Sequence, residues 1–254
     1  MEKGPVKFSS LAALLRLSHK YEVHHVQQAA LRRLRPAFPD TFEAWKTYES
    51  STLDFGPLNV RGAAMASRQV SMEPGEPIEA VNLLRRCGYD AMLLIALHMC
   101  TTLDMHTLLH GTARADGTRE ALAMDDLERC LVARETLQGR NAEFNRRMLD
   151  FESSGSGRPA CATPAYCGRR AGKARTVAVN TLRDEDGCES EIGRRMFFVG
   201  LLSKAPELVK VCDTCVKHVL SSERQFVQEL WNDLPAIMGL EVSPWPPNSE
   251  AASS

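Results

Sequence analysis

Residues 8–21 have the sequence FSSLAALLRLSHKY. Leucines recur in it at intervals of three and four, as at Leu11 and Leu15, and this is the spacing of one face of an α-helix. We expect Ser9 or Ser10 to cap the first turn, because a hydroxyl there can accept a free backbone N–H. The stretch therefore predicts a helix that packs on a core, and similar spacing continues along most of the chain.

Further helices are predicted on the same grounds. They cover about residues 23–35, 78–87, 91–101, 104–110, 124–151, 164–183, 192–204 and 213–234. Gly88 and Gly111 are expected to end two of them, and Asp90 is expected to cap the helix over 91–101. Residues 50–77 are rich in Pro and Gly, which predicts a long loop. Since no stretch favours a strand long enough to seed a sheet, the predicted fold class is all-α, an irregular helical bundle.

The composition is that of an ordinary globular protein. Hydrophobic residues make up 44% of the 254 residues and charged residues 25%, close to the usual values. The net charge of −1 provides no overall attraction to nucleic acid or to an anionic membrane. The most apolar run, residues 91–100, is too short for a membrane span of about 20 residues, so we expect a buried core helix and no membrane segment.

The N-terminal stretch predicts the compartment. The apolar run over residues 11–15 is interrupted by Arg16, so it does not form the core of a secretory signal peptide, and the chain contains no Asn-x-Ser/Thr glycosylation site. We therefore expect a cytoplasmic or nuclear protein. In that reducing environment, cysteine pairs are better interpreted as thiols or metal ligands than as disulfides.

Composition also suggests where domains begin and end. The sequence SSGSG at 153–157 is typical of a flexible linker. We predict a helical region over 1–152, a linker over 153–158, and a small helical subdomain over 159–240. Residues 241–254 are rich in Pro and Ser and are expected to be a disordered tail.

Four cysteines in the predicted C-terminal subdomain have the pattern of a metal site. Cys161 and Cys167 form one pair, and Cys212 and Cys215 form a second pair. Two such pairs can supply the four thiolates of a tetrahedral zinc site once the chain folds back. Each pair lies at the start of a predicted helix, which favours the thiolate form. We therefore predict one structural zinc ion, which would contribute folding energy to a subdomain with few large apolar residues.

Other interpretations of these cysteines remain open. They could be ordinary reduced, half-buried thiols. The Cys212–Cys215 pair could be a redox motif, although the βαβ pattern that usually accompanies one is missing. His218 and Cys188 are substitute ligands if one of the four cysteines does not bind.

A basic run and the absence of enzyme motifs bear on function. The run comprises Arg169, Arg170, Lys173 and Arg175. Such a run can contact phosphate groups, but it is more often a solvated helix face, so nucleic acid is not the favoured partner. The chain contains no P-loop, nucleophile elbow or HExxH motif. We therefore do not expect an enzyme.

Several segments together resemble a known family. They are FSSLAALLRLSHKY (8–21), AALRRL (29–34), PIEAVNLL (77–84), LERCLVARE (127–135), CATPAYC (161–167), CDTC (212–215) and LWNDLPAIMGL (230–240). In this order they are similar to the region that follows the BTB/POZ core in mushroom-type fungal BTB-domain proteins. The resemblance covers nearly the whole chain, from Phe8 to Leu240.

The resemblance implies a protein–protein interaction module, an adaptor or scaffold without catalytic activity. BTB domains dimerise, and in many families they deliver substrates to cullin-type ubiquitin ligases. The strands and helices of the BTB core are expected before Phe8, where only seven residues stand, so we expect a truncated chain that lacks most of a cullin-docking face. The alternative expectation is a zinc-stabilised regulatory protein that associates with nucleic acid.

Overall fold

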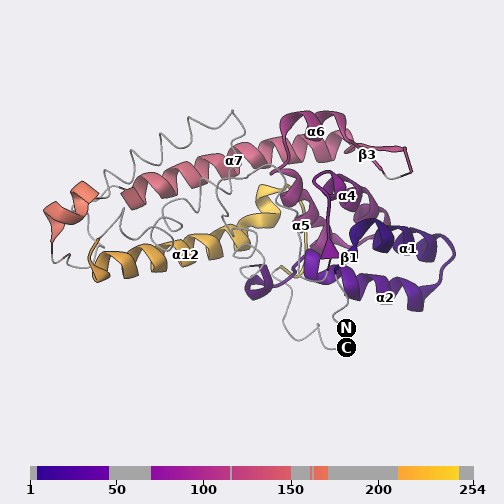
Figure 1. The fold of residues 1–254 in the computed structure, drawn as a ribbon, viewed down its shortest axis with the longest axis horizontal. Coiled ribbons are helices and arrows are strands. Elements are labelled where there is room, and N and C mark those ends of the chain that lie inside the picture. Colours follow the sequence, from indigo (N-terminus) through magenta and orange to yellow (C-terminus); the bar gives the residue numbers. More distant parts are fainter. Residues whose placement is uncertain are drawn as a thin grey trace. The chain divides into compact units, whose positions relative to one another are not determined.

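The computed structural model describes residues 5–45, 70–114, 116–149, 161, 163–170 and 211–245. The chain divides into two compact units, one of residues 1–134 with 232–254 and one of residues 135–231. The described part is mostly helical (Figure 1), which confirms the predicted predominance of helix. The strands among these residues form two pairs, each with strands of two residues.

The first unit begins with a strand that leads directly into a helix. β1 (Val6–Lys7) is followed without a break by α1 (Phe8–Lys20). The residue before α1 is therefore Lys7, and no side chain caps the helix. The expected cap by Ser9 or Ser10 is wrong, because both serines already lie inside the first turn.

A second helix packs along the first. α2 (His24–Leu34) continues into a short 3-10 helix, η1 (Arg35–Ala37), which contains Pro36. The predicted helix over 23–35 is thus confirmed to within a residue at each end. The ring of Phe8, the first residue of α1, meets that of Phe38 edge-on, with 6.3 Å between the ring centroids.

α4 and α5 form a second packed pair. β2 (Val70–Ser71) pairs in parallel with β1 and precedes α4 (Glu76–Cys87). α4 ends at Gly88 as predicted, and the φ of Gly88 is 73°, a conformation that favours glycine. α5 (Asp90–Cys100) begins at Asp90 itself, so the predicted capping role of Asp90 is wrong.

α5 is the core helix of the first unit. Every residue from Met92 to Cys100 is buried, and burial of each large apolar side chain stabilises the fold by about 1.5–3 kcal/mol. The indole of Trp45 lies 6.0 Å from the His98 ring, centroid to centroid. The interpretation of this run as a core helix is confirmed, and no helix in the described ranges is long and apolar enough to cross a bilayer.

A short helix and a hairpin follow α5. α6 (Met105–His110) has Asp104 as its N-cap, and the Asp104 carboxylate accepts the backbone N–H of Thr107 at 2.9 Å. β3 (Thr112–Ala113) and β4 (Arg119–Glu120) then pair antiparallel. The helix over 104–110 and its stop at Gly111 are confirmed.

Two long helices contribute to the second unit. They are α7 (Met124–Leu149) and α12 (Asp213–Ile237). The unit contains α7 from residue 135 onward and α12 up to residue 231. Within this unit the rings of Phe144 and Phe226 stack, with 4.4 Å between centroids and 14° between planes. A further helical stretch covers 164–170.

Some of the predicted organisation lies outside the described residues. This applies to the linker over 153–158, to the helix over 192–204, and to residues 246–254 of the expected tail. The bounds 1–152 and 159–240 proposed for the two domains remain a prediction.

Candidate metal centre

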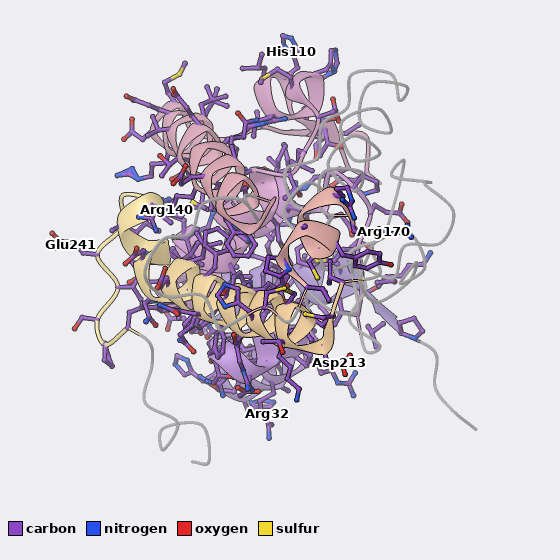
Figure 2. The ribbon with its side chains drawn as sticks, turned by 90° about the vertical axis from the view of Figure 1, so that its left-hand side faces the viewer. Arg32, His110, Arg140, Arg170, Asp213 and Glu241 are labelled. Carbon is purple, nitrogen blue, oxygen red and sulfur yellow. The ribbon has the colours of Figure 1, made fainter. Side chains whose placement is uncertain are left out.

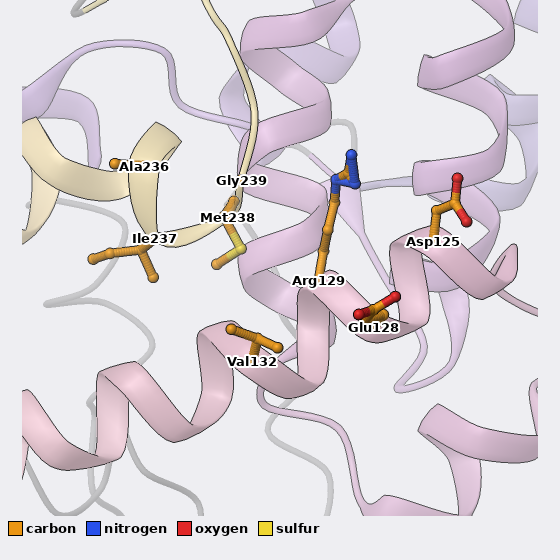
Figure 3. Close-up of a pocket in the computed structure, with 8 residues that line it drawn as sticks. All are labelled: Asp125, Glu128, Arg129, Val132, Ala236, Ile237, Met238 and Gly239. Carbon is orange, nitrogen blue, oxygen red and sulfur yellow. The ribbon is translucent and has the colours of Figure 1, made fainter.

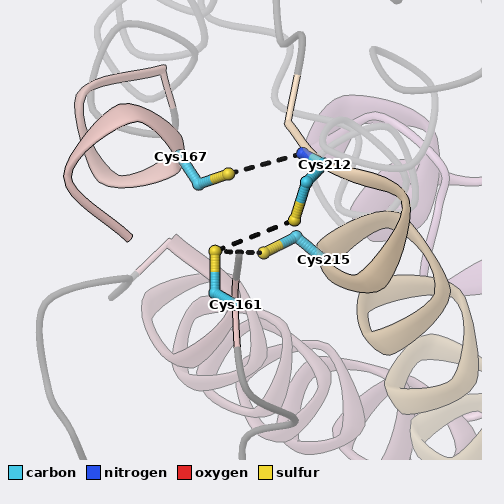
Figure 4. A group of neighbouring side chains, drawn as sticks. All are labelled: Cys161, Cys167, Cys212 and Cys215. Atoms are coloured by element: carbon cyan, nitrogen blue, oxygen red, sulfur yellow. Dashed lines mark hydrogen bonds between the residues drawn. The ribbon is translucent and has the colours of Figure 1, made fainter. Parts of the chain in front are cut away.

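The four predicted cysteines meet in the second unit. Cys161 precedes the helical stretch 164–170, and Cys167 lies within it. Cys212 precedes α12, and Cys215 lies in its first turn. Their sulfur atoms all lie within 4.8 Å of one another (Figure 4). Two chain segments that are far apart in the sequence thus bring their thiols to one place.

The distances between the sulfur atoms fit a tetrahedral metal site. Cys161 Sγ lies 3.7 Å from Cys212 Sγ and 3.5 Å from Cys215 Sγ. A zinc ion with four sulfur ligands at about 2.3 Å has neighbouring sulfur atoms about 3.8 Å apart. These distances also greatly exceed the S–S bond length of about 2.05 Å, and all four cysteines are free thiols. The donor set and its spacing therefore fit zinc.

Local hydrogen bonds orient the sulfur atoms. The backbone N–H of Cys212 donates to Cys167 Sγ at 3.3 Å. Thr163 begins the helical stretch, and its carbonyl accepts the backbone N–H of Cys167 at 3.0 Å while its hydroxyl lies 3.5 Å from Cys167 Sγ. The contact between Cys212 and Cys167 joins the two chain segments directly at the cluster.

The environment shifts the pKa values of Cys212 and Cys215 in opposite directions. The backbone N–H of Cys215 donates to Cys212 and, with the neighbouring thiols, lowers the pKa of Cys212 to about 7. Burial raises the pKa of the Cys215 thiol, and hydrogen bonding to Cys161 raises it further. At neutral pH Cys212 is therefore more ready than Cys215 to act as a ligand, and a cation bound by both would have to deprotonate Cys215.

The predicted substitute ligands are not among the group. His218 lies in α12 but does not belong to the cluster of four in the described residues. Cys188 lies outside the described residues.

Figure 2 shows sulfur atoms between the stretch that ends at Arg170 and the start of α12 at Asp213.

The predicted basic run is described only in part. Arg169 is exposed, and the Arg170 guanidinium lies over the Tyr166 ring, 5.4 Å from its centroid. Lys173 and Arg175 lie outside the described residues. The described half of the run thus supplies one exposed arginine and one arginine that stacks on an aromatic ring.

A cavity in the first unit was not predicted. It has a volume of about 410 Å³ and lies beside the first turns of α7 and the end of α12 (Figure 3). Its lining consists of Asp125, Glu128, Arg129, Val132, Ala236, Ile237, Met238 and Gly239. The Nε atom of Arg129 is buried and has no hydrogen-bond partner in the described part of the chain. No motif in the sequence marks these residues, because the two segments are about 100 positions apart.

Comparison of the chain with protein-family models, with curated proteins and with solved structures finds no match.

Proposed function

We propose that this chain is a non-catalytic protein-interaction module, and that one structural zinc ion bound by Cys161, Cys167, Cys212 and Cys215 stabilises its second unit. The observation that carries the proposal is the convergence of the four sulfur atoms within 4.8 Å. An ion bound there supplies rigid cross-links and no chemistry of its own, since a site closed by four thiolates keeps no position open for a substrate.

The energetic role of the metal follows from the sequence separation of its ligands. Cys167 and Cys212 are 45 positions apart, so bringing them together costs chain entropy. A metal that binds only the folded arrangement offsets this cost, because its binding free energy becomes folding free energy. Zinc is the cation proposed, since thiolates in a tetrahedral arrangement select it over the hard cations calcium and magnesium.

The interaction role is supported by the family resemblance of the sequence. The segments at 8–21, 77–84 and 230–240 are similar in order to the helical region of mushroom-type BTB proteins, which implies an adaptor or scaffold. The absence of known catalytic motifs from the sequence supports a binding role rather than an enzyme. The compartment proposed is the cytoplasm or the nucleus, where a reducing environment keeps cysteines as thiols.

Zinc content and helicity test the metal site. Elemental analysis of the full chain is expected to give about one zinc per molecule. The double variant Cys212→Ser, Cys215→Ser is expected to lose both the metal and part of the helical circular dichroism signal. Cys87→Ser is the matched control, because Cys87 is a half-buried free thiol outside the cluster, and it should keep both. The structural site is rejected if the wild-type chain contains no zinc and the double variant keeps the helical signal of the wild type.

Partner capture tests the interaction role. The zinc-loaded full chain, immobilised and exposed to a cell extract, is expected to retain one or more proteins that the double cysteine variant does not retain. A chain that captures no protein specifically contradicts the proposal. Salt-sensitive binding to DNA that is lost on Arg169→Ala and Arg170→Ala would favour the nucleic-acid alternative.

A further inference from the structure

Solvent does not reach the four thiols of the metal centre equally. Cys167 and Cys215 are buried, at 0% and 8% exposed, whereas Cys161 and Cys212 are half-buried. The two accessible thiols also lie on different segments, since Cys161 precedes the helical stretch 164–170 and Cys212 precedes α12. A small reagent in solution therefore meets one sulfur atom of each segment, and the oxidation of a cysteine follows this access.

The two accessible sulfur atoms are neighbours. Cys161 Sγ lies 3.7 Å from Cys212 Sγ (Figure 4). A disulfide bond is about 2.05 Å long, so the two atoms need to approach by about 1.7 Å to form one. Cys161 and Cys212 both lie outside the helices, whereas Cys167 and Cys215 lie within them. The accessible pair can thus close this distance without a change in the backbone of a helical residue.

The other described cysteines lack either the contact or the access. Cys100 and Cys130 are close enough to hydrogen-bond, but both are 0% exposed. Cys87 is half-buried, but it has no hydrogen bond to a second thiol within the described ranges. Among the described cysteines, Cys161 and Cys212 are thus the pair in which two neighbouring thiols are both accessible.

The chemistry of a metal-bound thiol favours oxidation at this pair. A cysteine that binds a metal ion is a thiolate, and the thiolate is the form that a peroxide oxidises. The first product is a sulfenic acid, which condenses with a neighbouring thiol when one is within reach. For Cys161 and Cys212 that neighbour is the other member of the pair.

We propose that hydrogen peroxide oxidises Cys161 and Cys212 to a disulfide and thereby releases the zinc ion of the metal centre. In the first step one thiolate attacks the peroxide, so that an S–O bond forms, the O–O bond breaks and hydroxide leaves. In the second step the other thiolate attacks the sulfenic sulfur, so that the S–S bond forms, the S–O bond breaks and a second hydroxide leaves. The two sulfur atoms lose two electrons in all, and the peroxide gains them.

The disulfide takes the place of the metal as a link between the two segments. Oxidation removes two of the four ligands and leaves Cys167 and Cys215, which are too few to complete the tetrahedral shell of zinc. The new bond joins residues 51 positions apart, so the segments stay connected without the ion. Because both sulfur atoms are accessible, a reducing thiol can attack the bond and restore the site. This inference rests on the proposed zinc site and specifies how that site is regulated.

Zinc release and disulfide mapping test the proposal together. The zinc-loaded full chain is treated with graded amounts of hydrogen peroxide, and a chromogenic chelator measures the zinc released. Mass spectrometry of the digested, unreduced protein identifies the disulfides. We expect one Cys161–Cys212 disulfide for every zinc ion released, and reversal of both changes by dithiothreitol with added zinc. Cys100 and Cys130 should stay reduced, because both are fully buried.

Cys87→Ser is the matched control. Cys87 is a half-buried thiol outside the cluster, so the variant should release zinc and form the disulfide at the same amount of peroxide as the wild type. In the wild type, Cys87 also reports whether peroxide reaches the protein. The proposal is overturned if zinc is retained when Cys87 is oxidised, if the disulfide joins Cys212 to Cys215 instead, or if the cluster is oxidised to sulfinic acid without a disulfide.

Failure of this inference can be distinguished from failure of the proposed metal site. A chain that binds zinc and keeps it under peroxide overturns the oxidation site and leaves the metal site in place. A chain purified without zinc rejects the metal site and the release of zinc with it. Disulfide mapping then still decides whether peroxide joins Cys161 to Cys212.

Discussion

Arg85 and Asp126 face each other through two hydrogen bonds. Arg85 stands in the last turn of α4 and Asp126 in the first turn of α7. The Arg85 Nε donates to Asp126 Oδ2 at 2.7 Å, and its Nη2 donates to the other carboxylate oxygen. The Asp126 side chain is 2% exposed, whereas that of Arg85 is 43% exposed. A buried carboxylate is thus neutralised by an arginine that reaches it from the surface.

Arg85→Ala is expected to lower the free energy of unfolding by about 2–3 kcal/mol. Removal of the guanidinium leaves the Asp126 charge buried without its partner, and the loss is smaller than for a fully buried pair because Arg85 is partly solvated. Urea denaturation measures the change. Arg86→Ala is the control, since Arg86 is exposed on the same turn and should have an effect within about 0.5 kcal/mol.

Glu79→Gln is expected to destabilise the first unit by about 1–3 kcal/mol. The Glu79 side chain is 8% exposed and pairs with Arg16, and its Oε1 lies 3.5 Å from Arg114 Nε. Arg114 also reaches Glu120 at 2.8 Å. The glutamine keeps the volume but removes a charge shared by two arginines. Glu128→Gln is the control, because Glu128 is exposed, and it should leave the urea midpoint unchanged. Equal shifts of the midpoint in the two variants would contradict a stabilising role for the ion pairs of Glu79 with Arg16 and Arg114.

Gly111→Ala and Gly88→Ala are expected to differ in their effects on thermal stability. Both glycines have positive φ, 75° and 73°. A Cβ on Gly111 would stand 2.1 Å from the carbonyl oxygen of Glu120, whereas a Cβ on Gly88 would meet nothing within 4 Å. We expect a loss of about 1 kcal/mol for Gly88→Ala from backbone strain alone, and at least about 3 kcal/mol for Gly111→Ala.

Alkylation of the metal-free chain is expected to distinguish the cysteines. In metal-free chain whose circular dichroism spectrum still shows the helices of the second unit, the reaction of Cys212 with iodoacetamide should rise with pH through a midpoint of about 7. The sign follows from the lowered pKa of Cys212, which leaves it largely as thiolate, the reactive form, above that pH. Cys215, whose pKa is raised by burial, should react far more slowly at neutral pH. Mass spectrometry of the digested protein reports both rates, and faster labelling of Cys215 would contradict the described hydrogen bonding.

Apolar spacing predicted most of the described helices, but not how they begin. The helix expected around 8–21 is confirmed, yet its start at Phe8 follows from the pairing of Val6 with Val70, a contact 64 positions along the chain. The serine cap at residues 9–10 was therefore wrong, because a tertiary contact overrode local propensity. Such contacts have no periodic pattern in the sequence.

The candidate metal ligands could be predicted because their chemistry is concentrated in a few residue types. Cysteine spacing alone selected Cys161, Cys167, Cys212 and Cys215, and the structure brings them together. The ion pairs of Asp126 and Glu79 were missed, since charged residues are common and their partners lie 41 and 63 positions away. The donation from the Cys212 backbone to Cys167 was missed for a similar reason, as every residue but proline has an N–H.

The order of the four cysteines along the chain has a consequence for biosynthesis. Cys161 and Cys167 emerge from the ribosome well before Cys215, which follows Cys167 by 48 positions. At about 5–20 residues per second, translation of that interval takes about 2–10 s. During this time the nascent chain carries half of the candidate metal site, with two thiols that no second pair yet covers. The speed of translation thus sets the earliest moment at which the four thiols can meet.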